Sequence, residues 1–191
     1  DIATGWIEQR ATYGKGQKDI ADKIKEIEAS LPFPILGFDC HNGNELLNQA
    51  LMRYFLNRKF PVQYTRSRPY HSNDNAHVEG KNWTHVRQWL GYRRFEDPLI
   101  VGLLNDLYKN EWRLFHNFFM PSVKLQAKER IGSKIIKRHD SPKTPYQRIL
   151  ASKFVATQTK HNLIQIFKTL NPFKLRMIID KKIAMLHKLA R

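Results

Sequence analysis

Three segments of the chain gather the side chains that could do chemistry. They are residues 1–8, DIATGWIE, residues 37–45, GFDCHNGNE, and residues 66–82, RSRPYHSNDNAHVEGKN. Carboxylates recur in all three, and carboxylate oxygens are the hard ligands that magnesium and manganese prefer. The cysteine and histidines are scattered without the spacing of a zinc site, so we interpret the histidines as surface or loop residues. The scattered residues are Cys40, His41, His71, His77 and His85.

The charge of the chain indicates a polyanionic partner. Lys and Arg number 33 against 17 Asp and Glu, which gives a net charge of +16. Residues 1–105 hold 14 basic and 12 acidic side chains, whereas residues 106–191 hold 19 and 5, so the net charges are +2 and +14. Such an excess is the electrostatic footprint of nucleic-acid binding. A basic RNA-associated protein would explain the charge, but not the three segments.

Length and composition limit the class of protein. A chain of 191 residues suffices for one domain with a substantial appendage or for two small domains, and 41% apolar residues support a packed core. One cysteine excludes an internal disulfide framework and fits a reducing compartment, so we expect a cytoplasmic protein. The longest apolar run, residues 99–104, is far too short to span a membrane, and we expect no membrane partner.

The elements that must position the three segments alternate between strand and helix. Apolar residues at helical spacing predict amphipathic helices, and short apolar or alternating runs predict strands. The order β-α-β-α-β-α predicts an α/β domain with a largely parallel sheet. Strands are predicted at 6–12, 33–38 and 62–65, and helices at 17–31, 44–59 and from 75 or 76 to about 90.

The second half of the chain is predicted to be mostly helical. Basic and apolar residues alternate around Gly132, which predicts a small two-stranded ribbon. The predicted elements are a helix at 106–119, the ribbon at 123–138, a rigid linker at 141–145, and helices at 162–170 and 173–189.

In this order and on these elements, the three segments resemble the catalytic core of the DDE transposases and retroviral-type integrases, in particular bacterial insertion-sequence transposases. The later stretches NFFMPSVKL and SPKTPYQRIL are similar to the C-terminal part of those transposases. The resemblance implies a ribonuclease-H-like fold and DNA transposition or integration by polynucleotidyl transfer in the bacterial cytoplasm or nucleoid. It also implies two divalent cations, Mg²⁺ or Mn²⁺, held by two Asp and one Glu.

The resemblance places Glu79, in NAHVEGKN, at the family's catalytic glutamate near the start of a helix. The family's second aspartate directly precedes the Asn-Gly turn, where this chain has His41, and imidazole is a poor magnesium ligand. Asp39 lies on the same strand face and is a candidate substitute, although its backbone is roughly 6–7 Å away. We therefore expect Glu79 and Asp39 to form an incomplete metal site that binds the cations poorly.

The family's first aspartate has no counterpart in this chain. The segment DIATGWIE is similar to the end of the family's second strand and the turn into the third, so Asp1 does not correspond to that aspartate. A count of carboxylates alone would give a triad of Asp1, Asp39 and Glu79. Without the central first strand, the strand at 6–12 would leave backbone groups unpaired. We therefore expect an N-terminally truncated core that is catalytically inactive and incompletely folded or aggregation-prone.

The predicted third helix carries the expected DNA contacts. By their spacing Asn75, Glu79, Asn82 and Arg87 share roughly one face, which in the family meets DNA next to the metals. Alternatively, Asn75 is a helix cap and the arginines are a solvated rim. Flanking side chains that suit phosphate contacts are those of Arg66, Arg68, Tyr70 and Lys81. We interpret Trp83, Trp89, Tyr92 and Trp112 as core and packing residues rather than base-stacking platforms.

Two functions stay open at this point. Residues 1–105 are predicted to be a partial integrase-like catalytic core and residues 106–191 a basic DNA-binding extension. The chain is then either an inactive DNA transposition or integration protein, or a non-catalytic DNA-binding regulator derived from a transposase. The expected partners are element ends and target DNA, and a homo-oligomer is an expected assembly.

Overall fold

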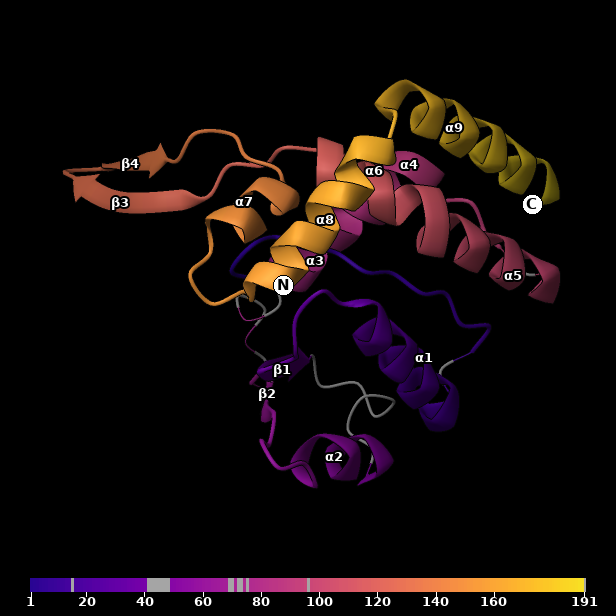
Figure 1. The fold of residues 1–191 in the computed structure, drawn as a ribbon, viewed down its shortest axis with the longest axis horizontal. Coiled ribbons are helices and arrows are strands. Elements are labelled where there is room, and N and C mark those ends of the chain that lie inside the picture. Colours follow the sequence, from indigo (N-terminus) through magenta and orange to yellow (C-terminus); the bar gives the residue numbers. More distant parts are fainter. Residues whose placement is uncertain are drawn as a thin grey trace. The chain divides into compact units, whose positions relative to one another are not determined.

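The computed structural model describes residues 1–14, 16–40, 49–68, 71, 74, 76–95 and 97–190 (Figure 1). Contacts within the chain define two compact units. We call Gln9–Leu107 with Asp180–Arg191 the sheet unit, and Asp1–Glu8 with Tyr108–Ile179 the hairpin unit. The predicted domains, 1–105 and 106–191, rest on charge and motif and remain a prediction about function.

The chain is a mixed α/β protein with many helices and small sheets. In the sheet unit, β1 (Gly37–Cys40) and β2 (Gln63–Arg66) pair in parallel, with Asp39 opposite Thr65. The crossover between them contains α2 (Gln49–Leu56). The parallel pairing is as predicted and needs a crossover of this kind, but the first strand lies at Gly37–Cys40 and not at the predicted 33–38.

A small apolar core holds the β1–α2–β2 crossover against α1 (Gln17–Ser30). Its buried residues come from both helices and from the residue before β2, and Phe38 and Tyr64 of the two strands pack against them. The rings of Phe38 and Phe55 lie 4.9 Å apart between their centroids. The amphipathic patterns that predicted these helices thus identify their packed faces. The buried residues are Ala21, Ile24, Leu51, Phe55 and Val62.

The predicted strand at residues 6–12 is wrong, because this segment is irregular. Its backbone is held by side-chain amides instead of a neighbouring strand. In the sheet unit, Ala11 N donates to Asn105 Oδ1 at 2.9 Å, and Asn105 Nδ2 donates to Ala11 O at 3.0 Å. A carboxamide offers one acceptor and two donors, so it can replace the two bonds that a strand residue exchanges with its partner.

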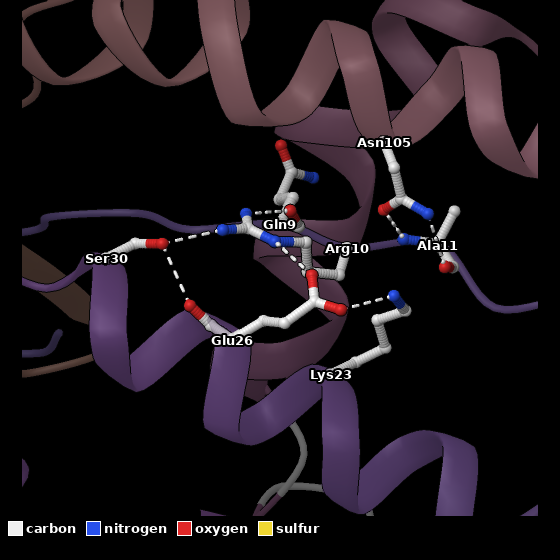
Figure 2. A network of polar contacts seen from close by, with 7 residues as sticks. All are labelled: Gln9, Arg10, Ala11, Lys23, Glu26, Ser30 and Asn105. Atoms are coloured by element: carbon white, nitrogen blue, oxygen red, sulfur yellow. Dashed lines mark hydrogen bonds and ion pairs between the residues drawn. The ribbon is translucent and has the colours of Figure 1, made fainter.

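An ion-pair network fixes the same segment to α1 (Figure 2). The Arg10 side chain is 3% exposed, and its guanidinium donates to Gln9 O at 2.6 Å and to Ser30 Oγ at 2.8 Å. Its Nε lies 3.6 Å from Glu26 Oε2, and Lys23 Nζ contacts the other oxygen of Glu26 at 2.6 Å. A buried cation is tolerated because a carboxylate and neutral acceptors surround it.

A long helical stretch follows the crossover, as predicted from about residue 76. It comprises α3 (Ala76–Asn82), the π-helical turn η2 (Trp83–Arg87) and α4 (Gln88–Leu90). It ends at Gly91, whose φ of +70° favours glycine. The next helix, α5 (Pro98–Leu107), covers the longest apolar run.

The hairpin unit has an aromatic core. Trp6 and Phe118 meet edge to face with centroids 5.7 Å apart, and Tyr146 stacks on Phe167 at 4.8 Å. Trp112 is 1% exposed, which confirms its predicted place in the core. The helices of this unit are η3 (Tyr108–Trp112), α6 (Arg113–Phe119), α7 (Pro145–Ala151), α8 (Thr157–Thr169) and the first part of α9 (Pro172–Leu189).

The predicted ribbon is present as an antiparallel hairpin of β3 (Leu125–Ile131) and β4 (Lys134–His139), which extends from the helices of its unit (Figure 1). Ile131 pairs with Lys134, so Gly132 and Ser133 form a two-residue turn. The φ of Gly132 is +61°, a left-handed conformation that such turns require.

The predicted rigid linker at 141–145 is in part a helix start. Thr144 caps α7, because its hydroxyl accepts from Gln147 N at 3.2 Å and the Gln147 side chain accepts from Thr144 N at 2.9 Å. Pro145 occupies the first helical position. The sequence TPYQ is thus a capping box with a proline at the first helical position. The linker prediction took the two prolines as a sign of extended chain and so missed this helix start. None of the helices in the described part of the chain is long and apolar enough to cross a membrane.

Candidate nucleic-acid interface

The crossover places Asp39 near the end of β1, as predicted. Thr65, directly opposite on β2, donates its hydroxyl hydrogen to Asp39 Oδ1 at 2.7 Å. Both side chains are exposed, whereas the neighbouring Cys40 is buried, with its thiol 3.5 Å from the Tyr64 hydroxyl. Asp39 is therefore a solvated carboxylate with one oxygen already hydrogen-bonded.

The described residues show no grouping of donors like the two-cation centre that the transposase resemblance implies. Glu79 in α3 and Asp39 are both exposed carboxylates. Within the described residues, no three His, Cys, Asp or Glu side chains group so that they could hold a metal ion. His41 lies outside the described residues, and its imidazole supplies no negative charge for magnesium. We therefore derive no transfer step through a metal from these residues.

The arginine that ends β2 and the one that follows it differ in their surroundings. Arg66 is exposed and lies opposite Cys40 in the strand register. Arg68 makes a two-pronged ion pair with Asp74, with Nε at 2.9 Å and Nη2 at 3.1 Å from the two carboxylate oxygens. The guanidinium lowers the pKa of Asp74 to about 2, and the carboxylate raises the pKa of Arg68. The positive charge of Arg66 is thus exposed to solvent, whereas the carboxylate of Asp74 neutralises that of Arg68.

The long helical stretch α3–η2–α4 carries several polar residues of the predicted DNA face. Glu79, Lys81 and Asn82 are exposed and Arg87 is half-buried. Asn75, predicted as a contact or cap, and Tyr70, predicted as a phosphate contact, lie outside the described residues. The structure thus keeps these described side chains near solvent on one helical stretch.

An exposed aromatic pair on this stretch was missed by the sequence analysis. Trp83 is 50% exposed and Tyr92 is 72% exposed, so their interpretation as core residues is wrong. Their ring centroids lie 6.4 Å apart, and the Arg87 guanidinium carbon sits 4.9 Å from the Tyr92 centroid. The guanidinium also donates to Gly91 O at 3.4 Å. We call Trp83, Arg87 and Tyr92 the aromatic platform.

A π-helical turn lies directly at Trp83. A π turn holds more residues than an α turn, so it shifts the faces of the helix on either side of it. Trp83 begins this turn and Arg87 ends it. The core assignment of Trp83 depended on its residue type, and a sequence pattern of 3.6 residues does not follow the helix through this turn. The sequence feature that could have indicated an exposed aromatic pair is a helix with two tryptophans that ends in a Gly-Tyr turn.

One pair of basic groups near the platform is electrostatically coupled. Loss of hydration lowers the pKa of Lys81, although its side chain still reaches solvent. Burial, together with the positive charge of Lys81 one turn earlier, lowers the pKa of His85 to about 4. His85 is therefore neutral at pH 7 and adds no positive charge to the surface.

The hairpin unit carries a second exposed basic surface. β3 and β4 together hold five Lys or Arg and one Glu. All of these charged side chains are exposed. In the described part of the chain, the helical stretch of the sheet unit and the β3–β4 hairpin thus both present exposed cations to solvent.

Fold and surfaces thus define a mixed α/β protein with exposed basic elements. The chain is similar to an uncharacterized protein, y4rM, of Sinorhizobium fredii, with 35% identity over 148 residues. The match covers 78% of this chain and 41% of the relative, so the chain spans less than half of that protein's length. No known family matches the chain, and no solved structure is significantly similar to it.

Proposed function

We propose that this chain is a DNA transposition or integration protein that binds DNA but does not catalyse polynucleotidyl transfer. The observation that carries the proposal is the aromatic platform on η2 and the turn after α4, preceded in the chain by exposed Lys81 and Asn82. The transposase resemblance implies DNA contacts on this same helix. Aromatic faces stack on bases and cations neutralise phosphates, so the combination suits a nucleic acid better than an acidic protein.

The ribonuclease-H-like topology belongs to this proposal as well. Its support is the β1–α2–β2 crossover followed by a helix that carries Glu79, in the order that the resemblance implies. The absence of transfer chemistry rests on the ligands. Histidine at position 41 removes a negative charge from the expected metal ligands. One carboxylate oxygen of Asp39 already accepts a hydrogen bond from Thr65. DNA binding tolerates such a change, whereas two-metal chemistry does not.

The direct test measures binding of the chain to a DNA duplex with a single-stranded overhang at several salt concentrations. We expect log affinity to fall linearly with log salt, and EDTA to leave affinity unchanged. The double variant Arg66→Gln/Lys81→Gln should lower the slope by about 2, since each phosphate contact contributes about 0.9. The control Lys18→Gln/Arg53→Gln removes two exposed cations from α1 and α2 and should leave the slope unchanged. Affinity independent of salt would rule the proposal out.

A strand-transfer assay with Mg²⁺ or Mn²⁺ tests the catalytic part separately. The chain as given should show no transfer, and activity there would contradict that part. His41→Asp restores a carboxylate at the place where the resemblance implies one. Activity gained by this variant would identify a transposase impaired at position 41.

His41 also favours a second candidate function, a non-catalytic regulator that occupies the DNA sites of an active transposase. In that case His41→Asp should bind DNA as tightly as the parent chain and still show no transfer. A regulator should also protect element ends from a nuclease at concentrations near its dissociation constant. Failure of the parent chain to protect them would remove this candidate.

A further inference from the structure

The β3–β4 hairpin is exposed on both faces. Of its strand residues only Ala127 is half-buried, and Ile131, Ile135 and Ile136 are 61%, 53% and 42% exposed. A two-stranded hairpin that covers no core gains little stability from burial. Three exposed isoleucines and five cations on such an element therefore need an explanation other than packing.

The strand register sorts the charges of the hairpin onto two different faces. Residues that oppose each other share a face, so Lys128 with Lys137 and Arg130 with Ile135 form one face. We call Lys128, Arg130 and Lys137 the basic face; no acidic residue shares it. On the other face, Glu129 pairs with Ile136 in register, and its carboxylate lies 4.0 Å from Arg138. On one face of the ribbon alone, therefore, every charged side chain is a cation.

Lys128 directly opposite Lys137 is an unfavourable arrangement by itself. Like charges across a strand pair destabilise it. If stability alone decided the sequence, an acidic residue at one of the two positions would stabilise the hairpin. An anion bound between the two ammonium groups would remove the repulsion, so this pair indicates a negatively charged partner.

The base of the hairpin is held rigidly. Ser122 and Lys143 exchange two backbone hydrogen bonds, at 3.0 and 3.2 Å. Just beyond β4, Asp140 accepts from Lys124 N at 2.6 Å and from Arg148 Nη1 of α7 at 2.5 Å. Asp140 and Arg148 are 13% and 10% exposed in their side chains. An exposed arm on a fixed base loses little conformational entropy on binding.

The shape and composition of this arm suit duplex DNA. Its two strands are roughly 5 Å apart, and the major groove, about 12 Å wide, admits a two-stranded ribbon. Seven residues of β3 extend roughly 23 Å, enough to follow the groove over several base pairs. Neither strand contains a Phe, Tyr or Trp on which an unpaired base could stack, and the one imidazole, that of His139, lies at the base of the hairpin. These features favour a double helix over a single strand.

We propose that the β3–β4 hairpin enters the major groove of double-stranded DNA with its basic face toward the phosphates. This inference rests on the proposed DNA-binding function and adds the element, its orientation and the form of DNA. Lys128 and Lys137 contact phosphates that flank the groove, and Arg130 reaches toward the groove near the hairpin tip. The platform in the sheet unit and the hairpin are then separate contacts with the same class of ligand.

Matched double variants test the orientation. Lys128→Gln/Lys137→Gln removes two cations from the basic face, and Lys134→Gln/Arg138→Gln removes two from the other face. With a blunt 20-base-pair duplex, the first should lower the salt slope by about 2 and the affinity at 150 mM salt by about 30-fold. The second should change affinity by less than about threefold. Equal losses would show a diffuse charge effect and overturn the proposed orientation.

A single reversal separates DNA binding from hairpin stability. Lys128→Glu converts the like-charge pair with Lys137 into an opposite-charge pair, so amide exchange in β3 and β4 should slow down. Duplex affinity should nevertheless fall at least as far as in the neutral double variant. Retained affinity in Lys128→Glu would refute the contact, and the slower exchange would exclude unfolding as the cause of a loss.

Competition identifies the groove and the form of DNA. A major-groove ligand such as methyl green should displace the chain from the blunt duplex, whereas the minor-groove ligand netropsin should not. The basic-face variant should bind single-stranded DNA as tightly as the parent chain does; an equal loss on single strands would contradict the major-groove contact. If the parent chain binds no DNA, the proposed function fails as well. If Arg66→Gln/Lys81→Gln weakens binding and the hairpin variants do not, only this inference fails.

Discussion

Asn117 binds the backbone of Ile7 at both of its polar groups. Ile7 N donates to Asn117 Oδ1 at 2.8 Å, and Asn117 Nδ2 donates to Ile7 O at 2.8 Å. Asn117 is fully buried, at 0% exposure, on α6. One helical side chain therefore supplies both backbone hydrogen bonds of a residue in an irregular segment 110 residues away in the sequence. Asn105 does the same for Ala11 within the sheet unit.

We expect Asn117→Ala to destabilise the hairpin unit strongly. The change leaves the N–H and C=O of the half-buried Ile7 without their partner, at a cost of about 1–3 kcal/mol. The amide of Ile7 should exchange with deuterium much faster, and the unfolding midpoint in urea should fall. Asn162→Ala, on the exposed face of α8, is the control and should change stability by no more than about 0.5 kcal/mol. An unaltered Ile7 amide would contradict the assignment.

The ion pair between Asp140 and Arg148 should fix the base of the hairpin in a pH-dependent way. The arginine and the Lys124 amide lower the pKa of Asp140 to about 2, below the unfolded value near 3.9. A lowered carboxyl pKa gives stability that is present above the unfolded pKa and is lost as the pH falls through about 2. Asp140→Asn should therefore speed tryptic cleavage within β3 and β4 at pH 8. Glu129→Gln, which removes only the exposed 4.0 Å pair with Arg138, should leave the rate unchanged.

Local elements were largely predictable because their signals are local. The helix at 17–31, the strand near 62–65 and the ribbon around Gly132 follow from spacing and turn residues, and the structure confirms them to within a few residues. The segment at 6–12 was not predictable in this way. Its alternation suggests a strand, but a strand needs a neighbour, and here Asn105 and Asn117 supply the hydrogen bonds from far along the chain.

The exposure of the charged and polar residues in the candidate site could be predicted from the sequence, but the exposure of its aromatic residues could not. Lys81 and Asn82 are exposed as a polar helical face should be. Trp83 and Tyr92 were assigned to the core because large aromatic residues are usually buried there, yet they are 50% and 72% exposed. The orientation of the hairpin charges depends on its register, which a bulge between Leu125 and Ala127 alters.

Burial of His85 should make the stability of the sheet unit depend on pH in the acid range. Its folded pKa of about 4 lies below the unfolded value near 6.5. Between these two pH values the unfolded chain binds a proton at His85 and the folded chain does not. Stability should therefore fall as the pH falls from about 6.5 to 4, by about 1 kcal/mol after allowance for solvent around the half-buried ring. His85→Gln should flatten this part of the profile, whereas His139→Gln, exposed on β4, should not. An identical slope in the parent chain and His85→Gln would contradict the lowered pKa.

The aromatic platform should bind unpaired bases by stacking. We expect Trp83→Ala to weaken binding to a single-stranded overhang by about 1–3 kcal/mol, roughly 5- to 150-fold, because each stacked base contributes about that much. Trp83→Phe keeps a ring and should recover most of the affinity. Phe154→Ala removes a 97% exposed ring from the hairpin unit and is the control for general loss of apolar surface. Blunt duplex affinity should stay within about twofold in Trp83→Ala, so a loss that is equal for blunt and overhanging DNA would contradict stacking at this position.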